Sequence, residues 1–157
     1  MLKSFPSLLP FSKFHKIVFV FLLLLCLFSS SSTFAEGLIF ITHPDTKEDS
    51  LRVKDISLIF TGKMRFWGSG VKIVPCLTDS GKVKNSLVED YIGMTPGRFN
   101  MYWKRIIFTG HGRPPKTFKT EKEIIFFVKD TPGALGVISS DNNVLNSGVS
   151  KLSIRSN

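Results

Sequence analysis

Blocks of apolar residues along the chain predict an alternation of strands and helices. Residues 38–42 are apolar and β-branched with hardly a polar break, which is typical of a strand that is buried on both faces. Apolar positions then recur at helical spacing from Val53 to Phe60, and Ser50 is the predicted N-cap of that helix. The glycine-rich turn at residues 68–70 leads into a second predicted strand over residues 71–75.

The alternation continues through the second half of the chain. An apolar repeat of four residues, from Val83 to Tyr91, predicts a helix that ends at Gly93. The next helix is predicted to begin at Thr95-Pro96, with Thr as the cap and Pro in the first turn. Its apolar stripe consists of Phe99, Tyr102, Trp103, Ile106 and Ile107.

A capping box at residues 120–123 predicts a further helix, which ends at residues 131–133. Two strands are predicted to follow, over residues 134–139 and 149–154. Strands and helices that alternate in this way predict an α/β domain with a mostly parallel central sheet.

The tetrapeptide Ile-Phe-Thr-Gly occurs twice, at residues 59–62 and 107–110. Each copy ends a helical stripe, where a glycine can take the left-handed conformation that stops a helix. The second copy runs into a Gly-x-Gly, but Pro115 stands at the third glycine position of a dinucleotide-binding loop and no helix is predicted there. A P-loop is not predicted either, because no Gly-Lys-Ser or Gly-Lys-Thr follows at the required spacing. We therefore predict that both copies are helix stops.

The first 35 residues have the composition of a secretory signal peptide. Three lysines precede an apolar run at residues 17–28, small residues follow, and Ala35 offers a cleavage site. The run is shorter than the roughly 20 residues that a membrane span needs. The alternatives are a retained membrane anchor and a lipid on Cys26, although Leu25 stands where a lipid-attachment site has a small residue. We expect residues 1–35 to be removed and residues 36–157 to form one periplasmic domain that is not embedded in a membrane.

The charge and the cysteine content limit which classes of ligand this domain is expected to bind and which role its cysteine can have. Removing Lys3, Lys13 and Lys16 from the 21 basic residues leaves 18 against 12 acidic residues, a formal net charge of +6. For an exported protein the anions at hand are envelope lipids, polyanions and small oxyanions, so nucleic acid is not expected. Cys76 is the only cysteine after residue 35, which excludes an internal disulfide, and its apolar surroundings favour a buried strand position over a reactive thiol.

Several motifs together carry a family resemblance. They are residues 59–63 with 66–67 and 70, residues 102–103 with 108–115, and residues 132–136. These motifs resemble the phosphate-type substrate-binding proteins of ABC transporters, and in particular their small single-domain members. The resemblance covers residues 38–154 and implies a single three-layer lobe of a type II periplasmic binding protein-like fold, with no enzymatic activity and no cofactor.

Two-domain members of that family clamp an oxyanion between two lobes, and the resemblance extends to the second lobe alone. There, relatives follow a strand with an arginine and a Ser-Gly-Thr turn that opens a helix. Ser80 and Gly81 match this turn, Lys82 stands at the threonine position, Cys76 stands at the arginine position, and Val137 replaces a tyrosine.

The turn before the second predicted helix is the candidate anion site. Helix N-termini offer N–H donors and a partial positive charge. The alternative is that Ser80 or Asp79 only caps this helix. The candidate ligand-binding residues are Thr78, Ser80, Gly81 and Lys82.

Other candidate chemistry is weaker. His43 and His111 lack metal-ligand spacing, so no metal site is expected, and no Gly-x-Ser-x-Gly motif supports an envelope hydrolase. Trp67 and Trp103 are predicted to be core anchors. A basic run is either a solvated face or a docking patch, and it consists of Lys104, Arg105, Arg113, Lys116 and Lys119.

The leading hypothesis is a non-enzymatic, periplasmic solute-binding-protein-like domain. It would bind a small oxyanion such as phosphate weakly, or serve as an accessory or sensory partner of an envelope membrane protein. The alternative is a protein-interaction module of the cell envelope that has lost ligand binding.

Export can be tested directly. The purified protein is expected to begin at or near Glu36, because a signal peptidase would cut after Ala35. Intact-mass measurement of the protein made from the full-length gene checks this. A mass that retains Cys26 with a lipid, or an uncut chain in the membrane fraction, would contradict it.

Overall fold

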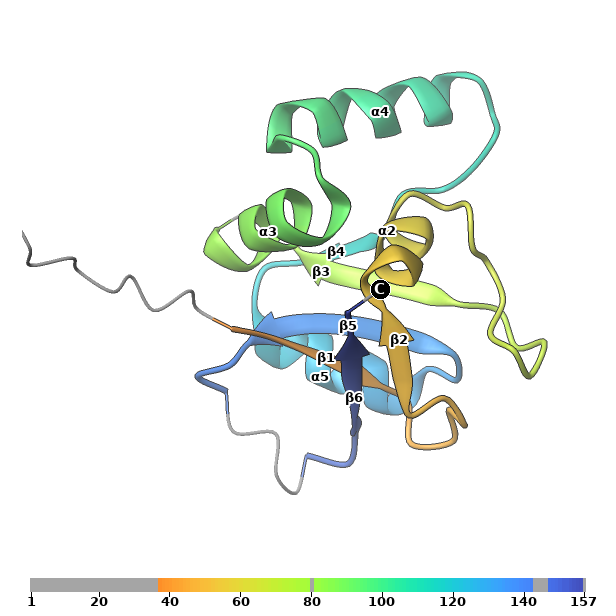
Figure 1. Ribbon diagram of the computed structural model, residues 1–157, viewed down its shortest axis with the longest axis vertical. Coiled ribbons are helices and arrows are strands. Elements are labelled where there is room, and N and C mark those ends of the chain that lie inside the picture. The colour runs from red at the N-terminus through yellow and green to blue at the C-terminus, as the bar shows by residue number, and fades with distance from the viewer. Residues whose placement is uncertain (1–36, 80, 143–146, 157) are drawn as a thin grey trace, which may run out of the picture. The chain divides into compact units, whose positions relative to one another are not determined.

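A six-stranded sheet lies at the centre of the domain in the computed structural model, which describes residues 37–79, 81–142 and 147–156 (Figure 1). The strand order is β2-β6-β1-β5-β3-β4. Within this sheet β1 runs antiparallel to both of its neighbours, and the other pairs are parallel. The mostly parallel α/β sheet is thus confirmed. The strands are β1 (Leu38–Thr42), β2 (Ser50–Arg52), β3 (Val74–Thr78), β4 (Lys116–Phe118), β5 (Ala134–Ser139) and β6 (Ser150–Arg155).

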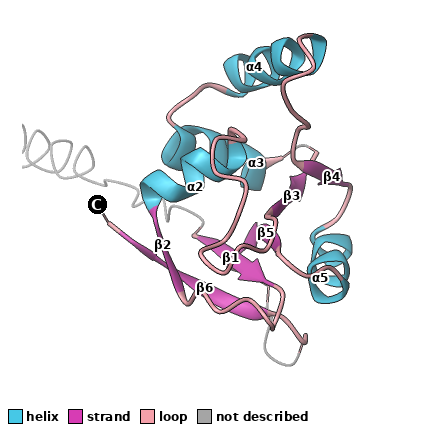
Figure 2. Cartoon of the chain, turned by 90° about the vertical axis from the view of Figure 1, so that its right-hand side faces the viewer, coloured by secondary structure: helices cyan, strands magenta, loops and turns pink. Residues whose placement is uncertain are grey.

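Helices cover both faces of the sheet and make a three-layer domain (Figure 2). One face carries α2 (Val53–Phe60), α3 (Lys82–Ser86) and the π-helix η1 (Leu87–Ile92), with α4 (Pro96–Phe108) packed on the outer side of these helices, and the other face carries α5 (Glu121–Asp130). Alternate strand residues supply the two cores, because successive side chains of a strand point to opposite faces. Leu77 packs on the α2 side, and its neighbour Cys76 packs on the α5 side.

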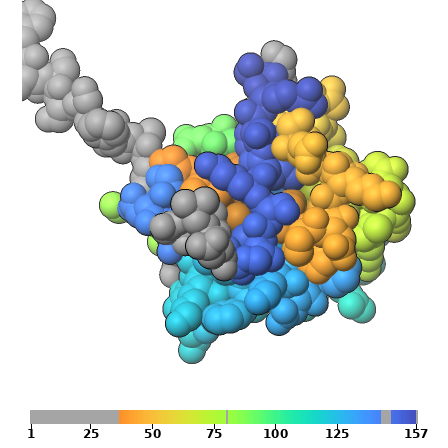
Figure 3. All heavy atoms as spheres, turned by 90° about the horizontal axis from the view of Figure 1, so that it is seen from below, coloured from red at the N-terminus to blue at the C-terminus, as the bar shows by residue number. Residues whose placement is uncertain are grey.

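The N-terminal strand segment differs from the prediction. Ser50 is not a helix cap but the first residue of β2, which pairs with the C-terminal strand β6. Figure 3 shows β6 in blue beside the orange segment that leads from β1 to β2. The helix begins after Arg52, whose side chain donates two hydrogen bonds of 3.0 Å to the Asp55 carboxylate. These bonds hold the pKa of Asp55 below its usual value.

The strand predicted at residues 71–75 begins later, at Val74. The preceding residues form a tight loop in which Trp67 N–H donates to the Val71 carbonyl at 2.8 Å and Phe66 bridges to Lys72. Trp67 itself is buried, and its indole N–H donates to the Gly133 carbonyl at 3.0 Å. Trp67 is therefore a core anchor, as predicted.

The helix predicted from a four-residue repeat changes its winding along its length. It starts as α3 and continues as the π-helix η1, which ends at Gly93 in the left-handed conformation. A π-helix has wider turns than an α-helix. The buried residues of η1 are therefore Leu87, Val88 and Ile92 rather than the predicted Leu87 and Tyr91. Tyr91, predicted to lie in the stripe, is half-buried, and its ring meets Phe40 edge-on at 5.1 Å between centroids.

Both Ile-Phe-Thr-Gly segments are helix stops, as predicted. Gly62 and Gly110 have φ angles of +73° and +68°. In each copy the glycine N–H donates to the carbonyl three residues earlier and the next N–H donates to the carbonyl five residues earlier, which is the Schellman pattern. The hydroxyls of Thr61 and Thr109 also donate to carbonyls four residues earlier, at 2.6 and 3.0 Å.

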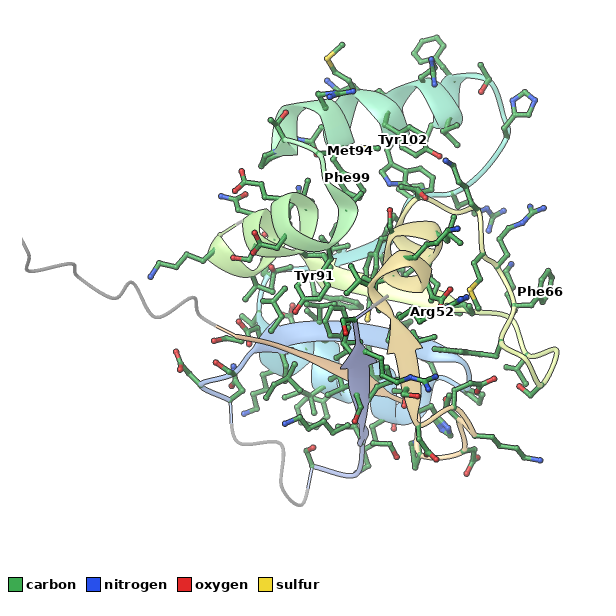
Figure 4. All side chains as sticks on the ribbon, viewed as in Figure 1. Arg52, Phe66, Tyr91, Met94, Phe99 and Tyr102 are labelled. Carbon is green, nitrogen blue, oxygen red and sulfur yellow. The ribbon has the colours of Figure 1, made fainter. Side chains whose placement is uncertain are left out.

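The end of α2 is also the point at which α4 is attached (Figure 4). Tyr102 Oη donates to the Thr61 carbonyl at 2.7 Å, and Trp103 Nε1 donates to the Phe60 carbonyl at 3.2 Å. Phe99 and Trp103 are buried, so the predicted stripe is correct at these positions. It is wrong at Ile107, which is 52% exposed because the helix has turned it away from the core.

The repeated segment supplies a matched pair of substitutions. Gly110→Ala should cost about 1–2 kcal/mol, since an alanine is strained at positive φ but would meet open space. Gly62→Ala should cost roughly 1–3 kcal/mol more, because its Cβ would lie 2.9 Å from Trp103 Cη2. Urea unfolding of the two variants measures the difference. Equal losses would show that Trp103 does not pack against this turn.

Candidate functional site

A hollow of about 370 Å³ lies where β3 and β5 end. Three of the four predicted site residues line it, namely Thr78, Gly81 and Lys82. The fourth, Ser80, lies outside the described residues. The rest of the lining consists of Val83, which follows Lys82 in α3, and of Lys119, Glu121 and Ser139 from distant parts of the chain.

The sheet topology explains why the hollow forms at this place. Strands β3 and β4 are parallel neighbours, so their carboxyl ends lie at the same edge of the sheet. The helix after β3 packs on one face and the helix after β4 packs on the other. The two connections therefore separate beyond the strand ends and leave a crevice, which is the usual ligand position in open α/β sheets.

Thr78 is the most unusual residue of the lining. It is the last residue of β3 and only 7% exposed. Its hydroxyl oxygen is buried and has no hydrogen-bond partner. A buried hydroxyl without a partner costs about 1–3 kcal/mol. In native proteins such a group is usually partnered by a water, an ion or a ligand.

Gly81 shapes the turn that follows Thr78. Its φ of +89° suits glycine, and it occupies the N-cap position of α3 without a side chain that could cap the helix. A Cβ at this position would meet nothing within 4 Å, so the backbone angle rather than crowding requires glycine. The Asp79 N–H donates to the Phe118 carbonyl at 2.9 Å, which ties the turn to the end of β4.

Lys82 and Lys119 bring positive charge to the hollow from its two sides. Lys82 is the first residue of α3, and Lys119 lies between β4 and α5. The backbone N–H of Lys119 donates to Glu123 Oε2 at 3.0 Å, which fixes the residue next to the capping box. The capping box at Thr120 and Glu123 is present as predicted.

Glu121 is a lining residue that the sequence reasoning missed. It is the first residue of α5, and its carboxylate accepts hydrogen bonds from the Ser139 N–H at 2.8 Å and from the Asn142 side chain. The carboxylate thereby joins the start of α5 to the end of β5. It also offsets one of the two lysine charges, so the lining carries only a small positive charge. Its place right after the capping-box threonine was the available signal.

Cys76, which stands at the arginine position of the resembled family, cannot contribute to anion binding. It is fully buried, and its thiol lies 3.5 Å from the Leu135 carbonyl. Burial raises the pKa of Cys76 to about 12, so the thiol stays protonated and uncharged at neutral pH. The buried strand position predicted for this cysteine is confirmed.

The residues of the predicted basic run lie on several elements. Lys104 and Arg105 lie on α4, Arg113 is exposed between α4 and β4, Lys116 lies on β4 with its Nζ 4.4 Å from the centre of the Phe127 ring, and Lys119 lines the hollow. Within the described part of the chain, no three His, Cys, Asp or Glu side chains are grouped so that they could hold a metal ion. The helices in this part are all too short or too polar to span a membrane.

Comparison with solved structures identifies the fold. The chain is similar to PstS from Borrelia burgdorferi, with a TM-score of 0.58, 23% identity and coverage of 76% of this chain and 47% of that one. It is also similar to a putative phosphate ABC transporter substrate-binding protein with bound phosphate from Clostridium perfringens (TM-score 0.55, 20% identity, 75% and 44% coverage). An ABC-type phosphate transport receptor from Vibrio cholerae gives a TM-score of 0.54 and 14% identity, with 75% and 46% coverage.

These likenesses establish a shared fold, and the chain spans about half the length of the structures it matches. The predicted lobe of a phosphate-type binding protein is therefore confirmed at the level of fold. No family model matches the sequence, and no curated protein matches it.

Proposed function

We propose that the domain is a non-enzymatic, periplasmic solute-binding-protein-like domain that binds a small oxyanion such as phosphate weakly in the hollow. The observation that carries this proposal is the buried, unpartnered hydroxyl of Thr78, in a lining that also holds Lys82 and Lys119. The fold likeness to phosphate-binding proteins supports it. The predicted signal peptide at residues 1–35 supports a place outside the cytoplasmic membrane.

Each group of the lining has a defined task in this proposal. The Thr78 hydroxyl donates a hydrogen bond to an oxygen of the anion and thereby gains the partner that it lacks. Lys82 and Lys119 supply charge from opposite sides, and hydrogen bonds from charged donors are the stronger ones. The turn at Gly81 keeps side-chain bulk away from the approaching anion.

The same lining explains why binding is weak. Glu121 places a carboxylate in the hollow, which repels a fully charged anion. The described lining residues include no arginine, and Cys76 stands at the strand position where the resembled family has one. Held by this lobe alone, an anion would have one side in water, where solvent and salt screen each charge interaction.

An alternative function is an accessory or interaction module of the envelope without a ligand. The observations that favour it are Cys76 and Lys82, which stand where the resembled family has arginine and threonine. The two functions differ in one measurable property, which is whether oxyanions stabilise the folded domain.

Phosphate affinity is the first test. We expect a Kd in the high-micromolar to millimolar range, which corresponds to roughly −4 to −6 kcal/mol. Lys82→Ala and Lys119→Ala should each weaken binding, and Ser80→Ala combined with Lys82→Ala should weaken it further. Calorimetry with phosphate and sulfate measures this, with Lys122→Ala as a control on an exposed part of α5 outside the lining.

Two outcomes of that titration would change the interpretation. Submicromolar affinity in a monomer would contradict the weak-site proposal. If no binding is detected and phosphate does not change the melting temperature, the interaction module would be favoured instead.

Thr78 provides a second test, in which stability and binding move in opposite directions. Thr78→Val should raise the free energy of unfolding by about 1 kcal/mol without ligand, because it removes an unpartnered buried hydroxyl. The same variant should lose most of the stabilisation by phosphate. Thr61→Val is the matched control, since Thr61 is equally buried but donates to the Ser57 carbonyl, and it should destabilise by about 1 kcal/mol. Thermal melts with and without phosphate measure both effects, and a destabilised Thr78→Val would show that its hydroxyl already has a structural role.

A further inference from the structure

The outward face of α4 combines exposed apolar side chains with cations, and we propose that it docks on the surface of an anionic phospholipid membrane. This face shares no residue with the hollow described above. Because the two surfaces have different residues, the proposal does not depend on phosphate binding.

The attachment of α4 to the rest of the domain determines which side faces outward. Phe99 and Trp103 are buried, and the polar atoms of Tyr102 and Trp103 are bonded to the end of α2. With 3.6 residues per turn, the opposite side of the helix must then point away from the core. Two perpendicular views agree that α4 is the outermost element on its side of the sheet (Figures 1 and 2).

Two large apolar side chains lie along that outward side. Met101 is 71% exposed and Phe108 is 95% exposed. They are seven residues apart, which is about two helical turns, so they project from the same side with a spacing of roughly 10 Å along the axis. Ile107, with an exposure of 52%, adds apolar surface beside Phe108. Transfer of an almost fully exposed phenylalanine side chain from water into an apolar environment is favourable.

Cations flank this apolar line on both sides. Lys104 lies on one side, Arg98 and Arg105 lie on the other, and all are exposed. The sequence has no Asp or Glu anywhere from residue 91 to residue 120, so no neighbouring carboxylate along this segment neutralises them. An exposed apolar line between cations is typical of helices that lie in the headgroup region of a membrane, where Lys and Arg meet lipid phosphates.

The shape and charge of the face favour a lipid surface over a protein. A second copy of this chain would place the same cations opposite one another, which is unfavourable. A stable protein interface buries about 800 Å² on each partner and requires complementary shape. A helix of 13 residues, about 20 Å long, presents a convex ridge instead. Lipid headgroups rearrange around such a ridge and need no matching pocket.

Vesicle binding tests the proposal. The protein made from the full-length gene, with its N-terminus read by intact mass, is mixed with vesicles of phosphatidylglycerol and phosphatidylethanolamine or of phosphatidylcholine alone. We expect binding to the anionic vesicles that weakens with salt. Phe108→Ala should reduce it roughly tenfold. The triple variant Arg98→Gln/Lys104→Gln/Arg105→Gln should reduce it by about 100-fold.

Matched controls separate α4 from general charge and from the N-terminal segment. Phe126→Ala removes a phenylalanine side chain from α5 that is 56% exposed, and Lys122→Gln/Lys129→Gln/Lys151→Gln removes the same charge elsewhere. Both control variants should bind almost as the unmodified protein does. Phe108→Trp adds an exposed indole to a protein whose Trp67 and Trp103 are buried, and brominated lipids should quench it. The same lipids should leave Phe126→Trp unquenched.

The proposal fails if the unmodified protein does not bind anionic vesicles at low salt. It also fails if the control triple variant loses as much binding as the α4 triple variant, or if both introduced tryptophans are quenched alike. Failure in the vesicle assay combined with self-association that Phe108→Ala abolishes would identify a second copy as the occupant of this face.

Discussion

The attachment of Trp103 and Tyr102 to the end of α2 determines much of the architecture on that side of the sheet. A helix leaves its last carbonyls without partners, and here the indole and phenol of α4 donate to the carbonyls of Phe60 and Thr61. The contact thus completes α2 and fixes the rotation of α4 about its own axis. Met101 and Phe108 are exposed as a direct consequence, because a helix cannot bury Trp103 and these residues against the same neighbour. The contact between α4 and the end of α2 therefore also determines which apolar side chains of α4 are exposed.

Capping residues and glycines correctly predicted the helices whose ends are determined by residues within or next to the helix. Thr95 and Thr120 cap α4 and α5 as expected, and the left-handed glycines end α2 and α4. The three-residue strands β2 and β4 could not be predicted, because each exists only through pairing with a partner distant in sequence. Ser50 is the clearest example: a good helix cap by composition, it is drawn into the sheet by pairing with Ser153.

The candidate site shows the same division. Thr78, Gly81 and Lys82 are close in sequence, so a single turn motif was enough to predict them. Lys119, Glu121 and Ser139 join them only because the strand order places the ends of β3, β4 and β5 at one edge. Glu121 matters most among these, since its carboxylate changes the charge that a ligand meets. A prediction from the turn alone therefore overestimates the attraction for an anion.

The burial of Cys76 gives the domain a built-in reporter of its own opening. The thiol lies in β3, two residues before Thr78, and has no exposure to solvent in the folded state. A thiol reagent can reach it only when the central sheet separates, and a thiol with a pKa of about 12 in the folded state reacts negligibly until then. In a chain without residues 1–35, the labelling rate would thus measure how often this strand becomes accessible. Labelling with and without a bound anion would show whether a ligand at the strand end slows that opening.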